Sequence, residues 1–128
     1  MKREFIFFIF VGGTGFVCDL IILQSLLYFV EMDSIKARLI SFSIAITVTW
    51  ILNRNITFKS TKGTNKATEW IKYAIANGLG GGINLLIYIL LVSSEINYFS
   101  SPLIALSIAS AVALIFNFFS NKIFVFNH

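Results

Sequence analysis

The sequence predicts an all-α integral membrane protein whose four transmembrane helices form two tandem helical hairpins of the same orientation. Composition is the first indication: hydrophobic residues make up 57% of the 128 residues and charged residues only 12%, whereas soluble domains usually carry about 25% charged residues. The second indication is a set of four apolar runs, each long enough to span a bilayer. The third is a repeat, because the phrase that closes the second run returns after the fourth.

The four expected spans cover residues 5–29, 35–52, 70–92 and 98–119. A helix needs roughly 20 mostly apolar residues to cross about 30 Å of hydrocarbon, and all four runs lie in the usual range. Backbone in hydrocarbon must satisfy its own hydrogen bonds, which favours α-helices, since β-barrel strands would alternate over about ten residues. The first run follows Lys2 and Arg3 as a secretion signal would, but its length and Asp19 predict a retained helix.

A duplication organises the chain as one membrane domain over residues 1–128. Repeat one covers about residues 3–58, a polar loop about 59–68, and repeat two about 69–126. FVGGTGFVCDLIIL in the first half aligns with IANGLGGGINLLIY in the second, and LNRNITF aligns with SNKIFVF. Each repeat holds two spans, so the two repeats share one orientation, as in parallel repeats related by an axis along the membrane normal.

The distribution of Lys and Arg predicts the topology. Eight of the ten lie on one side of the expected spans, and only Lys36 and Arg38 lie on the other. The eight are Lys2, Arg3, Arg54, Lys59, Lys62, Lys66, Lys72 and Lys122. The positive-inside rule then places both termini and the middle loop in the cytoplasm of a multi-pass inner (cytoplasmic) membrane protein. We expect the lipid bilayer, and no nucleic acid, as a partner, because no basic stripe with interleaved aromatic residues stands outside these flanks.

Small residues at four-residue spacing mark the faces where helices are expected to meet. Such stripes let backbones approach closely in lipid, where the hydrophobic effect no longer drives association. The stripes are Ser41, Ala45 and Thr49 in the second span, Ala74, Gly78 and Gly82 in the third, and Ala105, Ala109 and Ala113 in the fourth.

Polar residues inside the spans predict a polar interior, formed by Asp19, Asn84, Asn77 and Asn117. An aspartate at a helix centre costs about 2.5–3.5 kcal/mol on insertion scales, and an acid in the membrane is a functional hypothesis by default. Two interpretations of Asp19 stay open. One is a proton relay, and the other is a packing role with hydrogen bonds to Asn84 or to Ser and Thr across the repeat interface.

The repeated phrase supplies the candidate binding residues. Asn53, Arg54 and Phe58 close the first hairpin, and Asn121, Lys122 and Phe126 close the second. Cations there can simply anchor helix C-termini and meet lipid phosphates. Alternatively, they hold a phosphate headgroup, Arg54 through a bidentate fork and Lys122 as a point charge. The return of Asn and Phe at fixed offsets favours the second interpretation, because anchoring alone does not require them.

Signals for catalysis, cofactors and metals are missing from the sequence. The single histidine is His128 and the single cysteine is Cys18, so no Cys/His metal set can form. No phosphate-binding or dinucleotide-binding glycine motif follows a strand. We therefore expect a protein that is not an enzyme and that binds no metal and no cofactor.

With these features in place, the chain resembles GtrA-like proteins, a family of small four-span membrane proteins. The resemblance rests on FVGGTGFVCDLIIL and KARLISFSIAITVTWILNRNITF in the first half. In the second half it rests on EWIKYAIANGLGGGINLLIYILL and FNFFSNKIFVF, so it covers nearly the whole chain. In the family an Asn-Arg phrase with a following Phe closes each hairpin, whereas here Lys122 stands where Arg is common. That difference keeps the charge but loses the fork.

The resemblance implies a flippase for a polyprenyl-phosphate-linked sugar, such as undecaprenyl-phosphate glucose, working from the cytoplasmic to the outer leaflet. It implies polyprenyl-phosphate sugar lipid and membrane glycosyltransferases as partners, in modification of cell-surface polysaccharides. Two alternatives stay open: a scaffold for a glycosyltransferase that moves nothing, and a small multidrug-resistance-type exporter that uses Asp19. Four helices enclose little cavity, which favours a homodimer.

Overall fold

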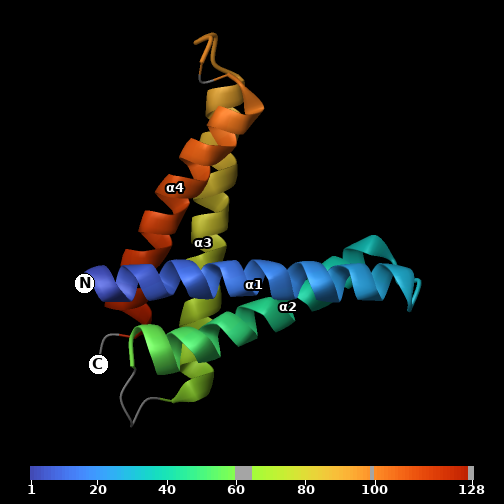
Figure 1. Ribbon diagram of the computed structural model, residues 1–128, viewed down its shortest axis with the longest axis vertical. Coiled ribbons are helices and arrows are strands. Elements are labelled where there is room, and N and C mark those ends of the chain that lie inside the picture. The colour runs from blue at the N-terminus through green and yellow to red at the C-terminus, as the bar shows by residue number, and fades with distance from the viewer. Residues whose placement is uncertain (60–64, 99, 127–128) are drawn as a thin grey trace. The chain divides into compact units, whose positions relative to one another are not determined.

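A computed structural model describes residues 1–59, 65–98 and 100–126 (Figure 1). Every regular element in these residues is helical, which confirms the predicted all-α class. The chain divides into two compact units, Met1–Gly63 and Thr64–His128. Each unit holds one helical hairpin, so the two are described in turn.

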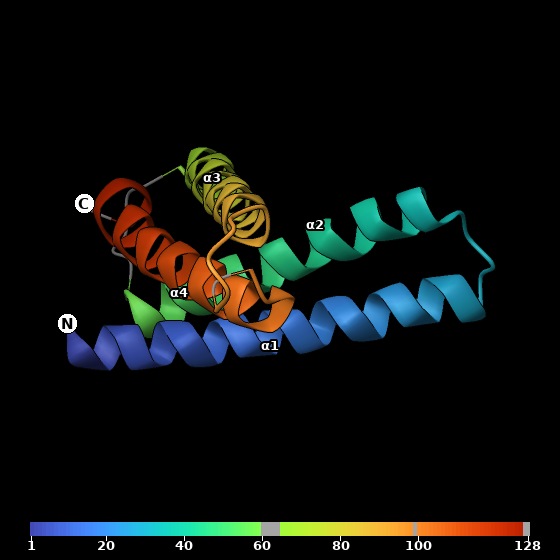
Figure 2. The same cartoon turned by 90° about the horizontal axis from the view of Figure 1, so that it is seen from above.

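The first unit is built from α1 (Lys2–Tyr28) and α2 (Ser34–Leu52), which pack along each other. Figure 2 shows the same hairpin from a second direction, closed by the short connection at residues 29–33. The side chain of Asp33 caps α2 by accepting a hydrogen bond, at 3.3 Å, from the backbone N–H three residues on. Such a cap satisfies one of the N–H groups left open at a helix start.

The second unit is built from α3 (Lys66–Val92) and α4 (Pro102–Ser120), again packed along each other. α3 starts four residues before the expected 70, because the Asn65 side chain caps it by accepting from two backbone N–H groups, at 2.9 and 3.3 Å. α4 starts four residues after the expected 98, at Pro102, which lacks a backbone N–H and suits a first helical turn. The predicted loop at 59–68 is therefore shorter than expected, and its residues 60–64 lie outside the described residues.

Both α2 and α4 continue into a π-helical turn, η1 (Asn53–Thr57) and η2 (Asn121–Val125). With these turns included, the four helices have 27, 24, 27 and 24 residues and the hydropathy of membrane spans. At 1.5 Å per residue the longer helices measure about 40 Å, more than the roughly 30 Å of hydrocarbon they must cross. The protein is thus a multi-pass membrane protein, as predicted.

Small residues form the buried face of α2 in the first unit. Ala37, Ser41 and Ala45 repeat every four residues and are all buried. Opposite them, Gly15 of α1 lies against Thr49, because a Cβ added to the glycine would overlap with the threonine methyl group. Close backbone approach of this kind is what stabilises helix pairs in lipid. The stripe predicted for the second span is confirmed at Ser41 and Ala45, and Thr49 packs at its end.

In the second unit, small residues form the buried face of α4, as predicted, but the predicted stripe on α3 does not. Ala105, Ala109 and Ala113 of α4 are buried, as predicted. On α3, however, Gly78 and Gly82 of the predicted stripe do not meet α4: they are exposed in the second unit, and a Cβ on either would meet nothing of that unit within 4 Å.

The buried face of α3 instead carries Tyr73, Ala76 and Gly80. Gly80 decides the rotation of the helix, since only a residue without Cβ leaves room for the Asn117 side chain. In the other unit, Phe8, Val11 and Gly15 occupy the same places on α1, each 65 positions earlier in the chain.

Candidate functional site

The repeated phrase folds into the same turn in both units. The Asn53 carbonyl accepts a hydrogen bond from the Phe58 N–H, and the Asn121 carbonyl accepts one from the Phe126 N–H, both at 2.9 Å. These bonds join residues five apart and define a π-helical turn, a rare element that is frequent at functional sites. The phrase is therefore a structural unit at the end of each hairpin, and not merely the end of an apolar run.

Both asparagines lie inside their units. Asn53 is 1% exposed and Asn121 is 0% exposed. Asn53 Oδ1 accepts a hydrogen bond from the Thr57 hydroxyl at 2.8 Å, and Asn121 Nδ2 donates to the Asn117 carbonyl at 2.7 Å. Their amides are thus part of the local support of the turns, although the sequence placed them among the headgroup-binding residues.

The phenylalanines of the phrase hold the two helices of each hairpin together. The rings of Phe8 on α1 and Phe58 lie with centroids 6.1 Å apart. Tyr73 on α3 and Phe126 lie at 6.0 Å in edge-on geometry. Aromatic pairs at this spacing add about 0.5–1.5 kcal/mol beyond the area they bury. Because Phe8 and Tyr73 are repeat-equivalent, the same contact fixes the same hairpin end in both units.

Two half-buried cations stand on the π-helical turns. Arg54 lies on η1 and Lys122 on η2. The Lys122 ammonium lies 6.0 Å from the centre of the Phe118 ring, within the range of a cation–π interaction. The buried turn beneath each cation thereby fixes the charge at the hairpin end.

A further cation joins each of these ends. In the second unit, Lys72 of α3 lies over the ring of Phe124, at 5.3 Å. In the first unit, Arg3 of α1 lies over the ring of Phe7, also at 5.3 Å. The sequence counted both only as topology signals, so each hairpin end offers more positive charge than the repeated phrase alone.

Glu69 is a residue that the sequence analysis missed. It is fully buried on α3, one turn before Tyr73. A buried carboxylate is costly unless charge or hydrogen bonds compensate it. Its repeat-equivalent is Glu4, 65 positions earlier, which lies 3.8 Å from the N-terminal ammonium. The sequence did contain a signal for Glu69. A glutamate occurs at equivalent repeat positions near the basic start of the first span and of the third span.

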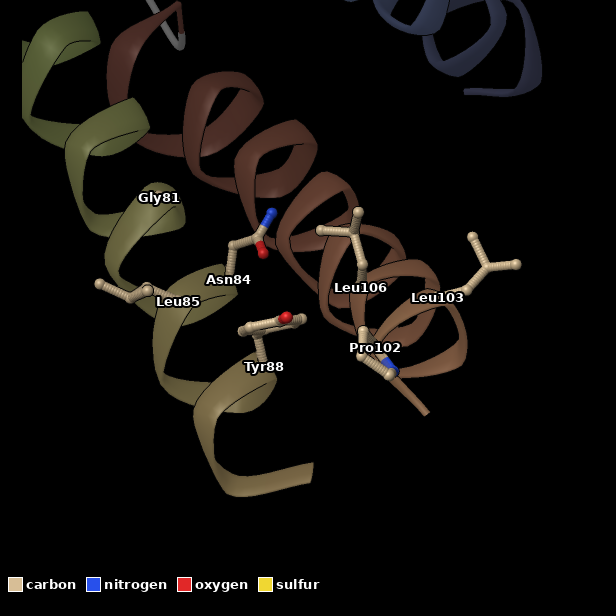
Figure 3. Close-up of a pocket in the computed structure, with 7 residues that line it drawn as sticks. All are labelled: Gly81, Asn84, Leu85, Tyr88, Pro102, Leu103 and Leu106. Carbon is tan, nitrogen blue, oxygen red and sulfur yellow. The ribbon is translucent and has the colours of Figure 1, made fainter. Parts of the chain in front are cut away.

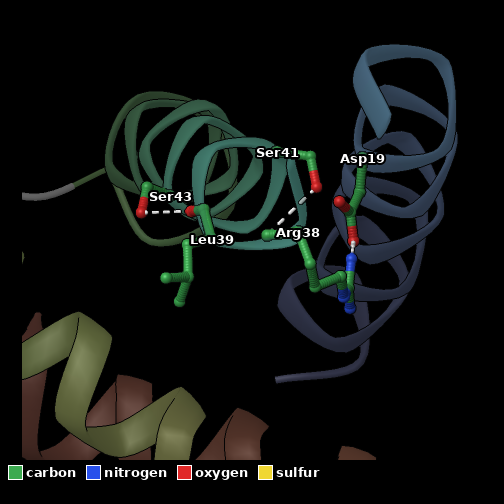
Figure 4. A network of polar contacts seen from close by, with 5 residues as sticks. All are labelled: Asp19, Arg38, Leu39, Ser41 and Ser43. Atoms are coloured by element: carbon green, nitrogen blue, oxygen red, sulfur yellow. Dashed lines mark hydrogen bonds and ion pairs between the residues drawn. The ribbon is translucent and has the colours of Figure 1, made fainter. Parts of the chain in front are cut away.

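Asp19 has a partner that the sequence did not identify. Arg38 Nη1 donates to Asp19 Oδ2 at 2.5 Å, from α2 to α1 within one hairpin (Figure 4). The sequence had counted Arg38 only among the charges on the side opposite to the cytoplasm. The structure thus makes Asp19 half of an ion pair inside the first hairpin. Its placement in an interior shared with Asn84 stays a prediction.

The other polar interior residues make neutral contacts in the second unit. Asn84 of α3 donates to the Ser110 hydroxyl of α4 at 3.4 Å, and Asn77 donates to the Tyr73 carbonyl at 2.8 Å. Asn117 Oδ1 is buried at Gly80 and accepts no hydrogen bond from the residues that the structure describes. The repeat-equivalents Asp19 and Asn84 therefore both bridge their hairpins, one with charge and one without.

The part of the chain that the structure describes offers no candidate metal centre. No group of three or more His, Cys, Asp or Glu side chains comes together within the described ranges. Cys18 is a free, half-buried cysteine in α1, and His128 lies outside the described residues. The candidate site is accordingly the cationic end of each hairpin, built on a π-helical turn.

Comparison with known proteins gives one family. Residues 7–126 match the family model described as "GtrA/DPMS, transmembrane domain". A search of curated proteins found no significant match. The family match spans both hairpins, including both π-helical turns.

Proposed function

Because the chain belongs to the GtrA/DPMS transmembrane-domain family, we propose that it flips a polyprenyl-phosphate-linked sugar from the cytoplasmic to the outer leaflet. Undecaprenyl-phosphate glucose is an example of such a lipid. Its sugar-phosphate head is the part that hydrocarbon excludes, since an uncompensated charge is costly in lipid. A carrier must therefore offer the phosphate a cation at the membrane surface and a polar route between helices.

The observation that carries this proposal is the cationic π-helical turn at the same end of both hairpins. Arg54 and Lys122 are held by turns whose asparagines and phenylalanines are packed inward. We assign the phosphate contact to Arg54 and Lys122, and assign positioning of those cations to Asn53, Asn121, Phe58 and Phe126. Arg54 binds through a planar fork and Lys122 as a point charge, so the two hairpins contact the headgroup differently.

The ion pair of Asp19 argues against the alternative function of a small multidrug-resistance-type exporter that uses Asp19. Exporters of that type need an acid that binds and releases protons as substrate moves. Asp19 instead forms an ion pair with Arg38 within one hairpin, and this structural contact disfavours that role. We retain the scaffold as the competing function, since a protein that only recruits a glycosyltransferase also needs charged hairpin ends.

The proposal extends to the cellular setting. We propose an inner-membrane protein with both termini in the cytoplasm that performs no chemistry itself. A membrane glycosyltransferase supplies the lipid-linked sugar on the inside, and a second one consumes it outside during modification of cell-surface polysaccharide. We further propose that it works as a homodimer, because one four-helix chain encloses little cavity.

Flipping by the purified protein separates carrier from scaffold. In proteoliposomes containing a fluorescent polyprenyl-phosphate sugar, a membrane-impermeant quencher reports how fast lipid reaches the outer leaflet. We expect Arg54→Lys to slow this flipping about ten- to a hundredfold, because a charge-assisted hydrogen bond contributes about 1.5–3 kcal/mol. The same charge remains, so pure anchoring would survive this change.

The matched control is Lys59→Gln, which removes an exposed cation just beyond the same turn. It should leave the flipping rate unchanged. Wild-type rates in well-inserted Arg54→Lys and Arg54→Gln proteins would reduce Arg54 to a topology anchor. No flipping by the wild-type protein would favour the scaffold.

A further inference from the structure

The first hairpin carries a cation in an apolar groove at the end opposite its π-helical turn. The groove has a volume of about 430 Å³. Leu23 and Leu27 of α1 line one side, and Ile35, Arg38 and Leu39 of α2 line much of the other. It thus combines a charged group with a hydrocarbon surface, on the part of α2 where the helix begins.

Arg38 is paired yet remains accessible. Its Nη1 contacts Asp19 Oδ2 at 2.5 Å, while its side chain is 53% exposed and that of Asp19 only 17%. Within the described ranges, Asp19 is the one side chain that hydrogen-bonds the guanidinium. A guanidinium has five N–H donors in a planar fork, so the contact through Nη1 leaves further donors on a residue that lines the groove. Figure 4 shows the guanidinium reaching from α2 to the carboxylate on α1.

The second hairpin has a groove in the corresponding place, and none of the described residues that line it is charged. Its groove, of about 540 Å³, lies between α3 and α4 (Figure 3). Leu106 lines it and is the fifth residue of α4, as Arg38 is the fifth residue of α2. Asn84, the repeat-equivalent of Asp19, lines that groove and points from α3 toward α4, whereas Asp19 does not line the groove of the first hairpin. Because one hairpin forms its groove with Leu106, hairpin packing alone does not require a cation at this position.

We propose that Arg38 and its groove are a second lipid site, which binds the phosphate of an anionic polyprenyl lipid and lays its chain along Leu23, Leu27 and Leu39. The inference rests on the proposed function and deepens it. In the predicted topology this end faces the outer leaflet, where the headgroup of a flipped lipid arrives. A guanidinium and a phosphate match in charge and in bidentate geometry.

Asp19 has a defined role in this site. A cation in the membrane needs a counter-charge when no lipid is bound, and the carboxylate supplies it. The phosphate must then compete with Asp19 for the guanidinium, which weakens retention and lets the lipid leave. Asp19 is therefore a positioning residue that sets the affinity of the site.

Native mass spectrometry of the full chain in phosphatidylcholine nanodiscs tests the site, with undecaprenyl phosphate as the probe. The wild-type protein should bind lipid at Arg38 in addition to the lipid bound at Arg54 and Lys122 on the π-helical turns. Asp19→Asn combined with Arg38→Gln removes both charges together, so no unpaired carboxylate is left to disturb folding. This double variant should lose one bound lipid, with that site weakened about tenfold or more. Asp19→Asn alone should tighten it roughly threefold or more, because the competitor is gone.

Three controls make the result specific. Lys36→Gln removes an exposed cation two residues away and should leave binding unchanged. Undecaprenol, which lacks the phosphate, should not bind at this site, and inorganic phosphate should not displace the lipid. The inference is overturned if the double variant binds like the wild type, if Lys36→Gln weakens binding equally, if Asp19→Asn weakens it, or if inorganic phosphate displaces the lipid. The readout is binding, so a protein that flips nothing but loses lipid in the double variant would refute the proposed function and keep this site.

Discussion

Replacing Gly80 by alanine tests the packing on which the second hairpin depends. A Cβ at this position would lie 2.5 Å from Asn117 Cγ and 2.8 Å from its Nδ2, and still closer to its Oδ1. Real Cβ atoms essentially never come within 3.0 Å of such neighbours. The Oδ1 atom of Asn117 is buried at this helix contact, so either the amide must turn away or α3 and α4 must separate.

The magnitude follows from comparing two glycines in one helix. Overpacking a well-filled interface costs about 1–3 kcal/mol, whereas Gly to Ala inside a helix gains up to about 1 kcal/mol from propensity. Gly82→Ala receives the same propensity gain, but its Cβ would meet nothing within 4 Å. The difference in unfolding free energy between the two variants therefore measures the cost of the overlap alone. We expect Gly80→Ala to be about 1–3 kcal/mol less stable than Gly82→Ala.

Unfolding in mixed micelles, followed by intrinsic fluorescence or by cysteine accessibility, measures this difference. A parallel pair exists in the first hairpin, where Gly15→Ala overlaps with the Thr49 methyl group and Gly13→Ala meets open space. A loss of stability is expected there too, because the Thr49 methyl group moves only if the β-branched side chain turns about χ1 and its hydroxyl leaves the Ile46 carbonyl. Equal stability of Gly80→Ala and Gly82→Ala would refute the packing argument.

Two further predictions concern topology and the aromatic contact. A single cysteine at Thr64 should be protected from an impermeant reagent in intact cells while one at Ser94 is labelled, because the Lys/Arg bias places the middle loop inside; the reverse pattern would overturn the topology. Phe126→Ala should lower unfolding free energy by about 3 kcal/mol or more, as expected for a buried aromatic residue, and should weaken headgroup binding with it. Ile123→Ala, at a residue 64% exposed on the same turn, should do neither, and equal losses in both would argue against the Phe126–Tyr73 contact.

Sequence patterns were sufficient where one physical requirement acts on a whole segment. A span must be long, apolar and helical, so composition and run length predicted four helices. The boundaries moved where local chemistry intervened, at the Asn65 cap and at Pro102. The π-helical turns could not be predicted, because the same backbone groups can close α or π turns, and the packing around Asn53 and Asn121 selects between them.

The repeat also misled at one place. Gly78 and Gly82 form a regular four-residue stripe, yet Gly80, outside that stripe, meets the opposite helix. Small residues allow close approach at any of their positions, and spacing alone does not say which face is used. The face follows from the partner side chain, here Asn117, and that match exists only once two helices are packed.

By itself, then, the sequence determined the membrane class, the helical hairpins and the duplicated phrase that ends each of them. Those properties depend on the transfer of whole segments from water to lipid and on the periodic spacing of residues. Both can be read directly from the amino-acid sequence. Only the tertiary structure decided that Asp19 pairs with Arg38, that Glu69 is buried, and that the asparagines of the phrase support it from inside. Each of these depends on contacts between segments distant in the chain, or on burial within a packed turn. Such contacts follow from distances in space and from exposure to solvent, and the spacing of residues along the chain does not specify either.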